Sequence, residues 1–194
     1  MAKIDPKYEN PIDNFIVFEM CEPLSDDLHR RNITPNMITT VGFASSLLGS
    51  YYLYNYKILH FVLLYIFAYL CDCMDGYMAR KYKLETKFGD YYDHVTDVVQ
   101  MILVLYILWT RYDLLKYKKM VIISSMLLLM YLTTQGCQEI LMGNNTSDIL
   151  GITKNMCSDR IKDYIECIRH FGSGTVIFYV LFLSYYLWDR RQKS

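Results

Sequence analysis

The chain has 194 residues, enough for one domain, and its 20 basic residues balance its 20 acidic ones. This balance excludes the strongly basic surface that would favour nucleic acid as a partner. Hydrophobic residues make up 53 % of the sequence and are concentrated in long runs. The composition therefore favours a membrane protein over a soluble one.

The N-terminal part of the chain differs from the rest. Residues 1–10 are hydrophilic and lack the apolar core of a cleavable signal peptide, so we expect the first span to act as an uncleaved anchor. Residues 11–31 mix apolar and charged side chains, as a helix in the membrane interface does. We therefore expect an N-terminal interfacial segment over residues 1–33 and a membrane domain over residues 34–190.

Long runs without charge follow this segment. Residues 32–56, 120–138 and 171–188 contain no charged side chain, and each run approaches the roughly 20 apolar residues that cross a bilayer. Two shorter uncharged runs occupy residues 58–71 and 98–110. The sequence therefore predicts an all-α integral membrane protein, a bundle of five to six transmembrane helices preceded by an interfacial amphipathic helix.

Helix boundaries are predicted from polar and basic residues. Thr34-Pro35-Asn36 opens the first span, because proline at a helix start loses no hydrogen bond. The next helices are expected over residues 58–81, 89–110 and 120–142. Residues 139–170 carry nine charges, which exclude a span. Within them an apolar repeat at helical spacing indicates a surface helix: Ile161, Tyr164, Ile165 and Ile168.

The cysteines point to no structural site. Their spacing fits no zinc-binding pattern, and several lie in apolar runs where a thiol packs as a small hydrophobic group. We therefore expect no disulfide framework among the six, which are Cys21, Cys71, Cys73, Cys137, Cys157 and Cys167.

Four aspartates are spaced so that two helices would each present a pair on one face. Asp72 and Asp75 lie at i and i+3, and Asp93 and Asp97 lie at i and i+4. Two antiparallel helices joined by a short loop would turn all four carboxylates toward one another. A carboxylate near a bilayer centre costs about 2.5 to 3.5 kcal/mol, and like charges repel. Bound divalent cations would remove both penalties, because hard cations take carboxylate oxygens.

The residues around the aspartates suit a phosphate-bearing ligand. The same cations would bind a diphosphate and neutralise the charge that develops during its cleavage. Gly76 and Gly89 would let a nucleotide approach the backbone, and Arg80 could hold a phosphate oxygen. The alternative is a non-catalytic membrane scaffold or a transporter with intramembrane acidic residues. Intramembrane prenyl transfer also uses aspartates and magnesium, but the chain lacks the second aspartate-rich motif of that class.

Residues 72–97 read D-x-x-D-G-x-x-A-R-x8-G-x-x-x-D-x-x-x-D. This pattern resembles the signature of the class-I CDP-alcohol phosphatidyltransferase family at all eight defined positions, and the resemblance extends over residues 34–110. It implies six spans and an enzyme of phospholipid synthesis. That enzyme would move a substituted phosphate group from CDP-diacylglycerol or a CDP-aminoalcohol to an acceptor alcohol and release CMP.

The resemblance also implies roles for individual residues. Asp72, Asp75 and Asp93 would ligate two Mg²⁺ ions, with Mn²⁺ as the alternative. Asp97 would complete the metal site and deprotonate the acceptor hydroxyl as the catalytic base. The positions that bind the CDP-linked donor in the family correspond here to Pro35, Asn36, Gly76, Ala79, Arg80, Thr86 and Gly89.

The resemblance implies the substrates, whereas the orientation is argued from basic residues. The expected partners are a CDP-linked donor, an alcohol acceptor and the lipid bilayer, with a homodimer as a further expectation and no nucleic acid. Basic residues over 80–87 favour an active site facing the cytosol, whereas the basic loop at 111–119 argues the other way under simple alternation. Pro11-Ile12-Asp13 together with Asp93-His94 resembles choline and ethanolamine phosphotransferases.

Overall fold

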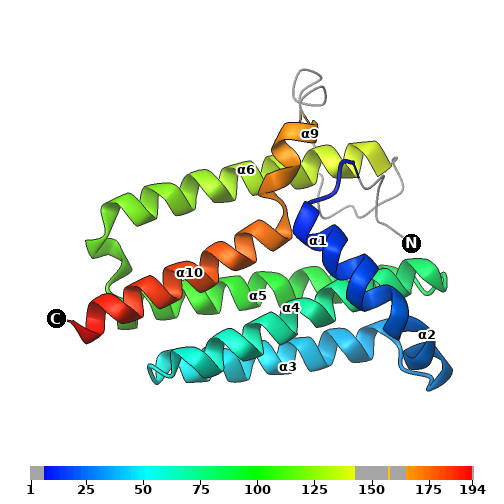
Figure 1. Ribbon diagram of the computed structural model, residues 1–194, viewed down its shortest axis with the longest axis horizontal. Helices are drawn as coiled ribbons and strands as arrows, with labels where there is room; N and C mark the ends of the chain where they lie inside the picture. The colour runs from blue at the N-terminus through cyan, green and yellow to red at the C-terminus, as the bar shows by residue number, and fades with distance from the viewer. Residues whose placement is uncertain (1–6, 143–156, 158–164, 194) are drawn as a thin grey trace.

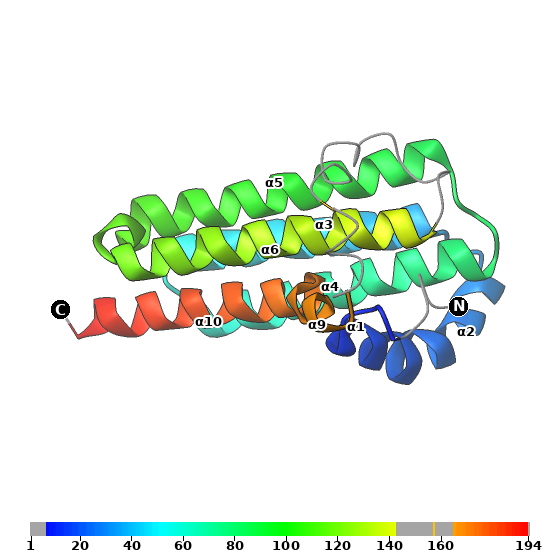
Figure 2. The same ribbon diagram turned by 90° about the horizontal axis from the view of Figure 1, so that it is seen from above.

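The computed structural model describes residues 7–142, 157 and 165–193. Across these residues the protein is helical and contains no strand. The long helices run side by side in an elongated bundle (Figure 1). The two views together place α6 and α3 on opposite sides of this bundle (Figures 1 and 2). Five described helices have 20 residues or more: α3 (Pro35–Tyr54), α4 (Ile58–Lys81), α5 (Lys87–Tyr112), α6 (Lys118–Met142) and α10 (Ser173–Gln192).

These helices confirm the prediction of an all-α membrane protein. Among the described residues, four segments could cross a bilayer by length and composition: Ile58–Lys81, Lys87–Tyr112, Lys118–Gln138 and Ile165–Gln192. The last of these joins α9 (Ile165–Ile168), a short 3-10 turn (Arg169–Phe171) and α10. Helix α3 is free of charge and 20 residues long, but it is not one of these four candidate spans.

Small residues of α3 allow it to pack closely against α4. A Cβ atom placed on Gly42 would lie 2.8 Å from Cys71 Cβ and 3.3 Å from the Ala68 carbonyl oxygen. Further along, Ser45 Oγ donates a hydrogen bond of 3.0 Å to the Leu64 carbonyl oxygen. Helices in lipid associate through such small-residue contacts, because no hydrophobic driving force brings them together. The close packing sets the start of α3 beside the end of α4.

Replacing Gly42 with alanine is expected to destabilise the bundle by about 1 to 3 kcal/mol, because the added methyl group would overlap Cys71 Cβ and press on the Ala68 carbonyl oxygen of α4. Thermal unfolding of the detergent-solubilised protein would measure the loss. Gly49→Ala is the matched control, since a Cβ there would meet Leu64 Cβ at 3.3 Å and no other atom closer than 3.6 Å. Equal losses for the two variants would contradict a specific close approach at Gly42.

A nearly continuous helical segment precedes the bundle. Helix α1 (Pro11–Ile16), a π-helical turn (Val17–Cys21) and α2 (Glu22–Arg30) cross obliquely over the end of α4 (Figure 1). The buried face packs on the bundle through Ile16, Val17 and Cys21. Other apolar side chains of the segment are exposed, as an interfacial helix requires: Phe15, Phe18, Met20 and Leu24. The domain boundary at residue 33 stays a prediction.

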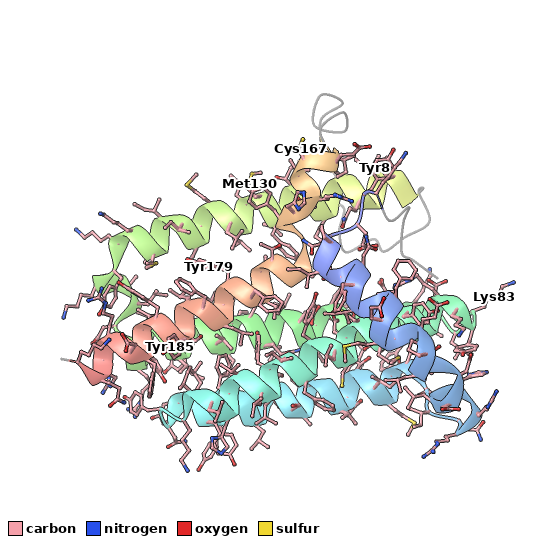
Figure 3. All side chains as sticks on the ribbon, in the orientation of Figure 1. Tyr8, Lys83, Met130, Cys167, Tyr179 and Tyr185 are labelled. Carbon is pink, nitrogen blue, oxygen red and sulfur yellow. A yellow bond between two sulfur atoms is a disulfide. The ribbon has the colours of Figure 1, made fainter. Side chains whose placement is uncertain are left out.

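The chain leaves α6 and enters α10 at the same end of the bundle. Thr134 Oγ1 donates to the Ile168 carbonyl oxygen at 3.0 Å, and Gln135 Nε2 donates to Ser173 Oγ at 3.4 Å. Along the two helices Tyr179 of α10 lies between α10 and α6 (Figure 3), and its hydroxyl is 2.9 Å from Ser124 Oγ. The first half of the surface helix predicted around residues 161–168 lies outside the described residues, and its last four residues form α9.

One cysteine pair corrects the sequence-based expectation. Cys137, near the end of α6, forms a disulfide with Cys157, 20 residues later, so the prediction of no disulfide is wrong. Cys137 and Cys157 form a small buried cluster with Ile165, and Tyr8 packs against it (Figure 3). The pairing depends on this tertiary contact, which cysteine spacing does not reveal. The other four cysteines of the chain are free thiols.

Candidate metal centre

Three of the four predicted aspartates form a cluster. Asp72 and Asp75 lie near the end of α4, Asp93 lies near the start of α5, and residues 82–86 join the two helices. One carboxylate oxygen of each aspartate lies within 4.8 Å of the other two. Three carboxylates at this separation repel one another unless a cation is shared between them. Their hard oxygen donors fit a divalent cation such as Mg²⁺.

Asp97 stands apart from this cluster. It lies one turn further along α5, is exposed, and does not belong to the group of three. It nevertheless lines a small cavity that the three clustered aspartates also border, together with Thr39, Gly42, Phe43, Ala68, Thr96 and Gln100. Three carboxylates are therefore close enough to share a cation, and the fourth lies outside this group but beside the same cavity.

Asp75 is the most deeply buried member of the cluster, with 4 % of its surface exposed. The hydroxyl group of Thr39 in α3 donates a hydrogen bond to Asp75 Oδ2. Sequence reasoning missed Thr39, because a threonine hydroxyl within a span ordinarily bonds to its own helix backbone. Here the Pro35 carbonyl oxygen is indeed 3.2 Å away, yet the same hydroxyl also orients a candidate metal ligand.

Replacing Thr39 with valine is expected to weaken Mn²⁺ binding by about 10- to 100-fold, the usual effect of removing a hydrogen bond to a metal ligand. Valine keeps the shape of threonine and removes only the donor. Titration of the purified protein with Mn²⁺, followed by electron paramagnetic resonance, would measure the affinity. Thr110→Val is the control, because the Thr110 hydroxyl bonds only to its own helix, at the Tyr106 carbonyl oxygen. Unchanged affinity in Thr39→Val would refute the orienting role.

The predicted donor-binding residues gather in two places. A Cβ atom on Gly89 would lie 2.9 Å from Asn36 Oδ1 and 3.1 Å from Thr86 Oγ1, so these three residues converge at the start of α5. Thr86 is the N-cap of that helix, and its hydroxyl oxygen accepts a hydrogen bond of 3.0 Å from the Gly89 N–H. The Arg80 guanidinium lies over Gly76, with Nη1 3.1 Å from the position of a Cβ there.

The two remaining predicted donor contacts occupy the same end of the bundle. Pro35 is the first residue of α3, directly before Asn36, and Ala79 lies one turn after Asp75 in α4. Both are half-buried. Whether any of the seven residues contacts a donor stays a prediction.

The main cavity beside the cluster has a volume of about 130 Å³. Tyr69 and Asp13 lie side by side on its wall, and the Tyr69 hydroxyl donates a hydrogen bond to Asp13 Oδ1. Burial raises the pKa of Asp13 to about 6, although hydrogen bonds from Tyr69 and from the Gly174 N–H lower it. The remaining lining residues are Glu9, Asn14, Val17, Asp72, Cys73, Asp75, Gly76, Arg80, Asp93, Gln135 and Ser173.

Two curated proteins have sequences related to part of this chain. A protein from Aquifex aeolicus, described as uncharacterised, is 37 % identical over 79 residues, which are 41 % of this chain and 40 % of that protein. The archaetidylinositol phosphate synthase of Pyrococcus horikoshii is 36 % identical over 99 residues, 50 % of this chain and 47 % of the synthase. The matched part of this chain thus spans less than half the length of each relative. No solved structure matches the chain.

A sequence profile of CDP-alcohol phosphatidyltransferases matches residues 32–157. The match covers more than half of the chain and includes all four aspartates, the start of α3 and the loop between α4 and α5. It agrees with the resemblance predicted from residues 72–97. The chain is a member of the CDP-alcohol phosphatidyltransferase family.

Proposed function

We propose that this protein transfers a substituted phosphate group from a CDP-alcohol to an acceptor alcohol and releases CMP, as an enzyme of phospholipid synthesis. The observation that carries the proposal is the cluster of Asp72, Asp75 and Asp93 on two registered helices within a complete family signature. A scaffold or a transporter could carry intramembrane acidic residues, but neither explains why they stand with Gly76, Arg80 and Gly89 at the spacing of the family signature.

The proposed chemistry assigns one task to each group. Asp72, Asp75 and Asp93 would hold two Mg²⁺ ions, which supply charge neutralisation for the diphosphate. Arg80 would bind a phosphate oxygen of the donor. Asp97 would accept the proton of the acceptor hydroxyl. The acceptor oxygen then forms a bond to the β-phosphorus, the bond from that phosphorus to the CMP oxygen breaks, and CMP leaves with the electron pair.

The exposed position of Asp97 supports its proposed role as a base. A ligand must be held close to the ions, whereas a base must reach a hydroxyl group that arrives with the second substrate. Asp97 borders the cavity of the cluster without belonging to the group within 4.8 Å. This position would place its carboxylate next to an acceptor hydroxyl bound beside the ions.

Both donor variants remain part of the proposal. A lipidic donor, CDP-diacylglycerol, would react with a small polar acceptor, and a soluble CDP-aminoalcohol would react with diacylglycerol. The relative named archaetidylinositol phosphate synthase supports the lipidic variant. Either variant needs the bilayer, because one substrate always carries acyl or alkyl chains.

We further propose that the site faces the cytosol. Four basic residues gather at the site end of the bundle: Arg80 and Lys81 end α4, Lys83 lies in the loop of residues 82–86, and Lys87 begins α5. Lys83 projects from this end (Figure 3). Clustered basic residues next to a span favour the cytosolic side.

The homodimer stays a prediction that analytical ultracentrifugation in detergent would test.

A radiolabelled-donor assay tests the function. Purified protein in lipid nanodiscs would be incubated with Mg²⁺ and CDP-diacylglycerol or CDP-aminoalcohols, each paired with candidate acceptors, and CMP would be quantified. We expect CMP and labelled lipid to form together, and EDTA to stop both. Absence of CMP with every donor and acceptor pair would overturn the proposal in favour of a non-catalytic scaffold. Transport of a substrate without its conversion would indicate a transporter.

A further inference from the structure

The main cavity has two chemically different sides. Arg80 is the one cation among the described lining residues, and it lies over Gly76, at a predicted donor contact. Glu9 and Asp13 lie on the N-terminal segment and bring two carboxyl groups to the lining in addition to the aspartate cluster. A ligand group that binds on the side of the N-terminal segment therefore lies next to acidic side chains.

Two other helices, α4 and α10, hold Asp13 in place. The hydroxyl of Tyr69, one turn before Asp72 in α4, donates a hydrogen bond to Asp13. The Gly174 N–H at the start of α10 donates another. A Cβ atom on Gly174 would lie 2.8 Å from Asp13 Oδ1 and 2.7 Å from the Tyr69 hydroxyl oxygen, so only glycine admits this contact. Next to it, Asn10 Nδ2 donates to the Arg169 carbonyl oxygen and to Thr175 Oγ1, both at 3.1 Å, and joins α1 to α10.

The start of α10 would otherwise suit a phosphate group. A helix N-terminus carries free N–H groups and partial positive charge, which bind anions. Here the Asp13 carboxylate already occupies that position through the Gly174 N–H. Arg169, four residues before α10, donates from Nη1 to the Lys7 carbonyl oxygen at 2.8 Å and does not line the cavity. A second anion at this place would be repelled by Asp13.

The neutral groups on this side of the cavity suit hydroxyl groups. Asn14 of α1, Gln135 of α6 and Ser173 of α10 line it together with Asp13 and Glu9. Amide and hydroxyl side chains both donate and accept hydrogen bonds, and carboxylates accept them from hydroxyl or ammonium groups. Three segments distant in sequence thus bring hydrogen-bonding groups to one wall of the cavity.

We propose that this wall, made by Glu9, Asp13, Asn14, Gln135 and Ser173, binds the small polar alcohol of the reaction, and that this alcohol carries hydroxyl or ammonium groups and no phosphate. The inference rests on the proposed function and names the substrate class at the same site. Asp13 determines specificity in two ways. Its carboxylate occupies the N-terminus of α10, where a phosphate group would otherwise bind, and it accepts hydrogen bonds from the alcohol.

Paired acceptors test the proposal directly. With CDP-diacylglycerol as donor, inositol would be compared with inositol 1-phosphate and glycerol with glycerol 3-phosphate, and serine and ethanolamine would test ammonium groups. CDP-choline and CDP-ethanolamine with diacylglycerol would test an ammonium group delivered by the donor. We expect kcat/KM for the phosphate-free member of the active pair to exceed that of its phosphorylated partner by at least about 10-fold, since one unfavourable charge contact costs more than 1.4 kcal/mol.

Two variants separate specificity from folding. With CDP-diacylglycerol as donor, Asp13→Asn is expected to raise KM for the alcohol by about 10-fold through loss of a charge-assisted hydrogen bond, while KM for CDP-diacylglycerol stays unchanged and reports an intact site. Glu9→Arg is expected to reduce the preference against the phosphorylated acceptor. Glu19→Arg, on the exposed face of the same segment, is the matched control and should leave the preference unchanged.

The outcomes distinguish the two proposals. CMP release that prefers a phosphorylated acceptor would overturn the alcohol pocket and leave the proposed function standing. Equal shifts of preference in Glu9→Arg and Glu19→Arg would also overturn it, because the effect would then come from net charge alone. Absence of CMP with every pair would overturn the proposed function and the pocket that depends on it.

Discussion

Asp93→Asn is expected to abolish measurable CMP release and to weaken Mn²⁺ binding by more than about 100-fold. This loss is larger than the loss expected for a residue that only hydrogen-bonds to a metal ligand. Asp93 is the single contribution of α5 to the three-carboxylate cluster, whereas α4 contributes two. Its loss therefore leaves the ions attached to one helix only. An asparagine side chain keeps one oxygen ligand but removes the negative charge that a hard cation requires.

Mn²⁺ titration and CMP quantification on the same preparation would test this expectation. Asp90→Asn is the matched control, because Asp90 lies one turn earlier on α5, is exposed, and faces His94 with 3.6 Å between Oδ1 and Nδ1. The control should keep metal affinity and turnover within about twofold, as an exposed ion pair contributes little. Wild-type Mn²⁺ affinity in Asp93→Asn would show that the cluster does not bind the metal.

Asp97→Asn is expected to lower kcat by about 10²- to 10⁴-fold, the range for loss of a general base. Mn²⁺ and donor affinities should change far less than in Asp93→Asn, because Asp97 lies outside the group of three. The contrast between the two variants therefore separates a ligand from a base, although both replace an aspartate on the same helix.

Binding and turnover must be measured separately for this test. Equilibrium binding of a CDP-linked donor in the presence of Mg²⁺ gives affinity without catalysis, and single-turnover CMP release gives the chemical step. If Asp97→Asn lost donor and metal binding to the same degree as Asp93→Asn, Asp97 would be a ligand rather than a base.

Local spacing explains why much of the fold could be predicted from the sequence. The expected second helix, residues 58–81, coincides with α4, and the expected third, 89–110, lies within α5. Each helix carries a pair of aspartates on one face, at i and i+3 in α4 and at i and i+4 in α5. The short loop between the helices makes them run antiparallel. Helical spacing is informative only over short stretches of sequence, and these aspartates lie within about 25 residues of one another. The cluster of Asp72, Asp75 and Asp93 could therefore be predicted from the sequence.

The remaining features depend on contacts between distant segments. Thr39 meets Asp75 across 36 residues, and Asp13 meets Tyr69 across 56. Neither contact has a periodic signal, because each requires the packing of α3 or α1 against α4. The disulfide failed as a prediction for the same reason: Cys157 reaches Cys137 through a tertiary cluster with Ile165. A single sequence reports spacing along helices but not which faces of distant helices meet.

The disulfide has a consequence for membrane sidedness. Cys137 lies two residues after Gln135, which lines the main cavity, so the bond and the site share one end of the bundle. Disulfides persist in oxidising compartments, whereas cytosolic thiols stay reduced. A site open to the cytosol leaves both thiols free in living cells, and rapid alkylation before lysis would then label Cys137 and Cys157. An intact bond under the same treatment places the carboxylate cluster on the lumenal or extracytoplasmic side, where CDP-linked substrates would have to be delivered.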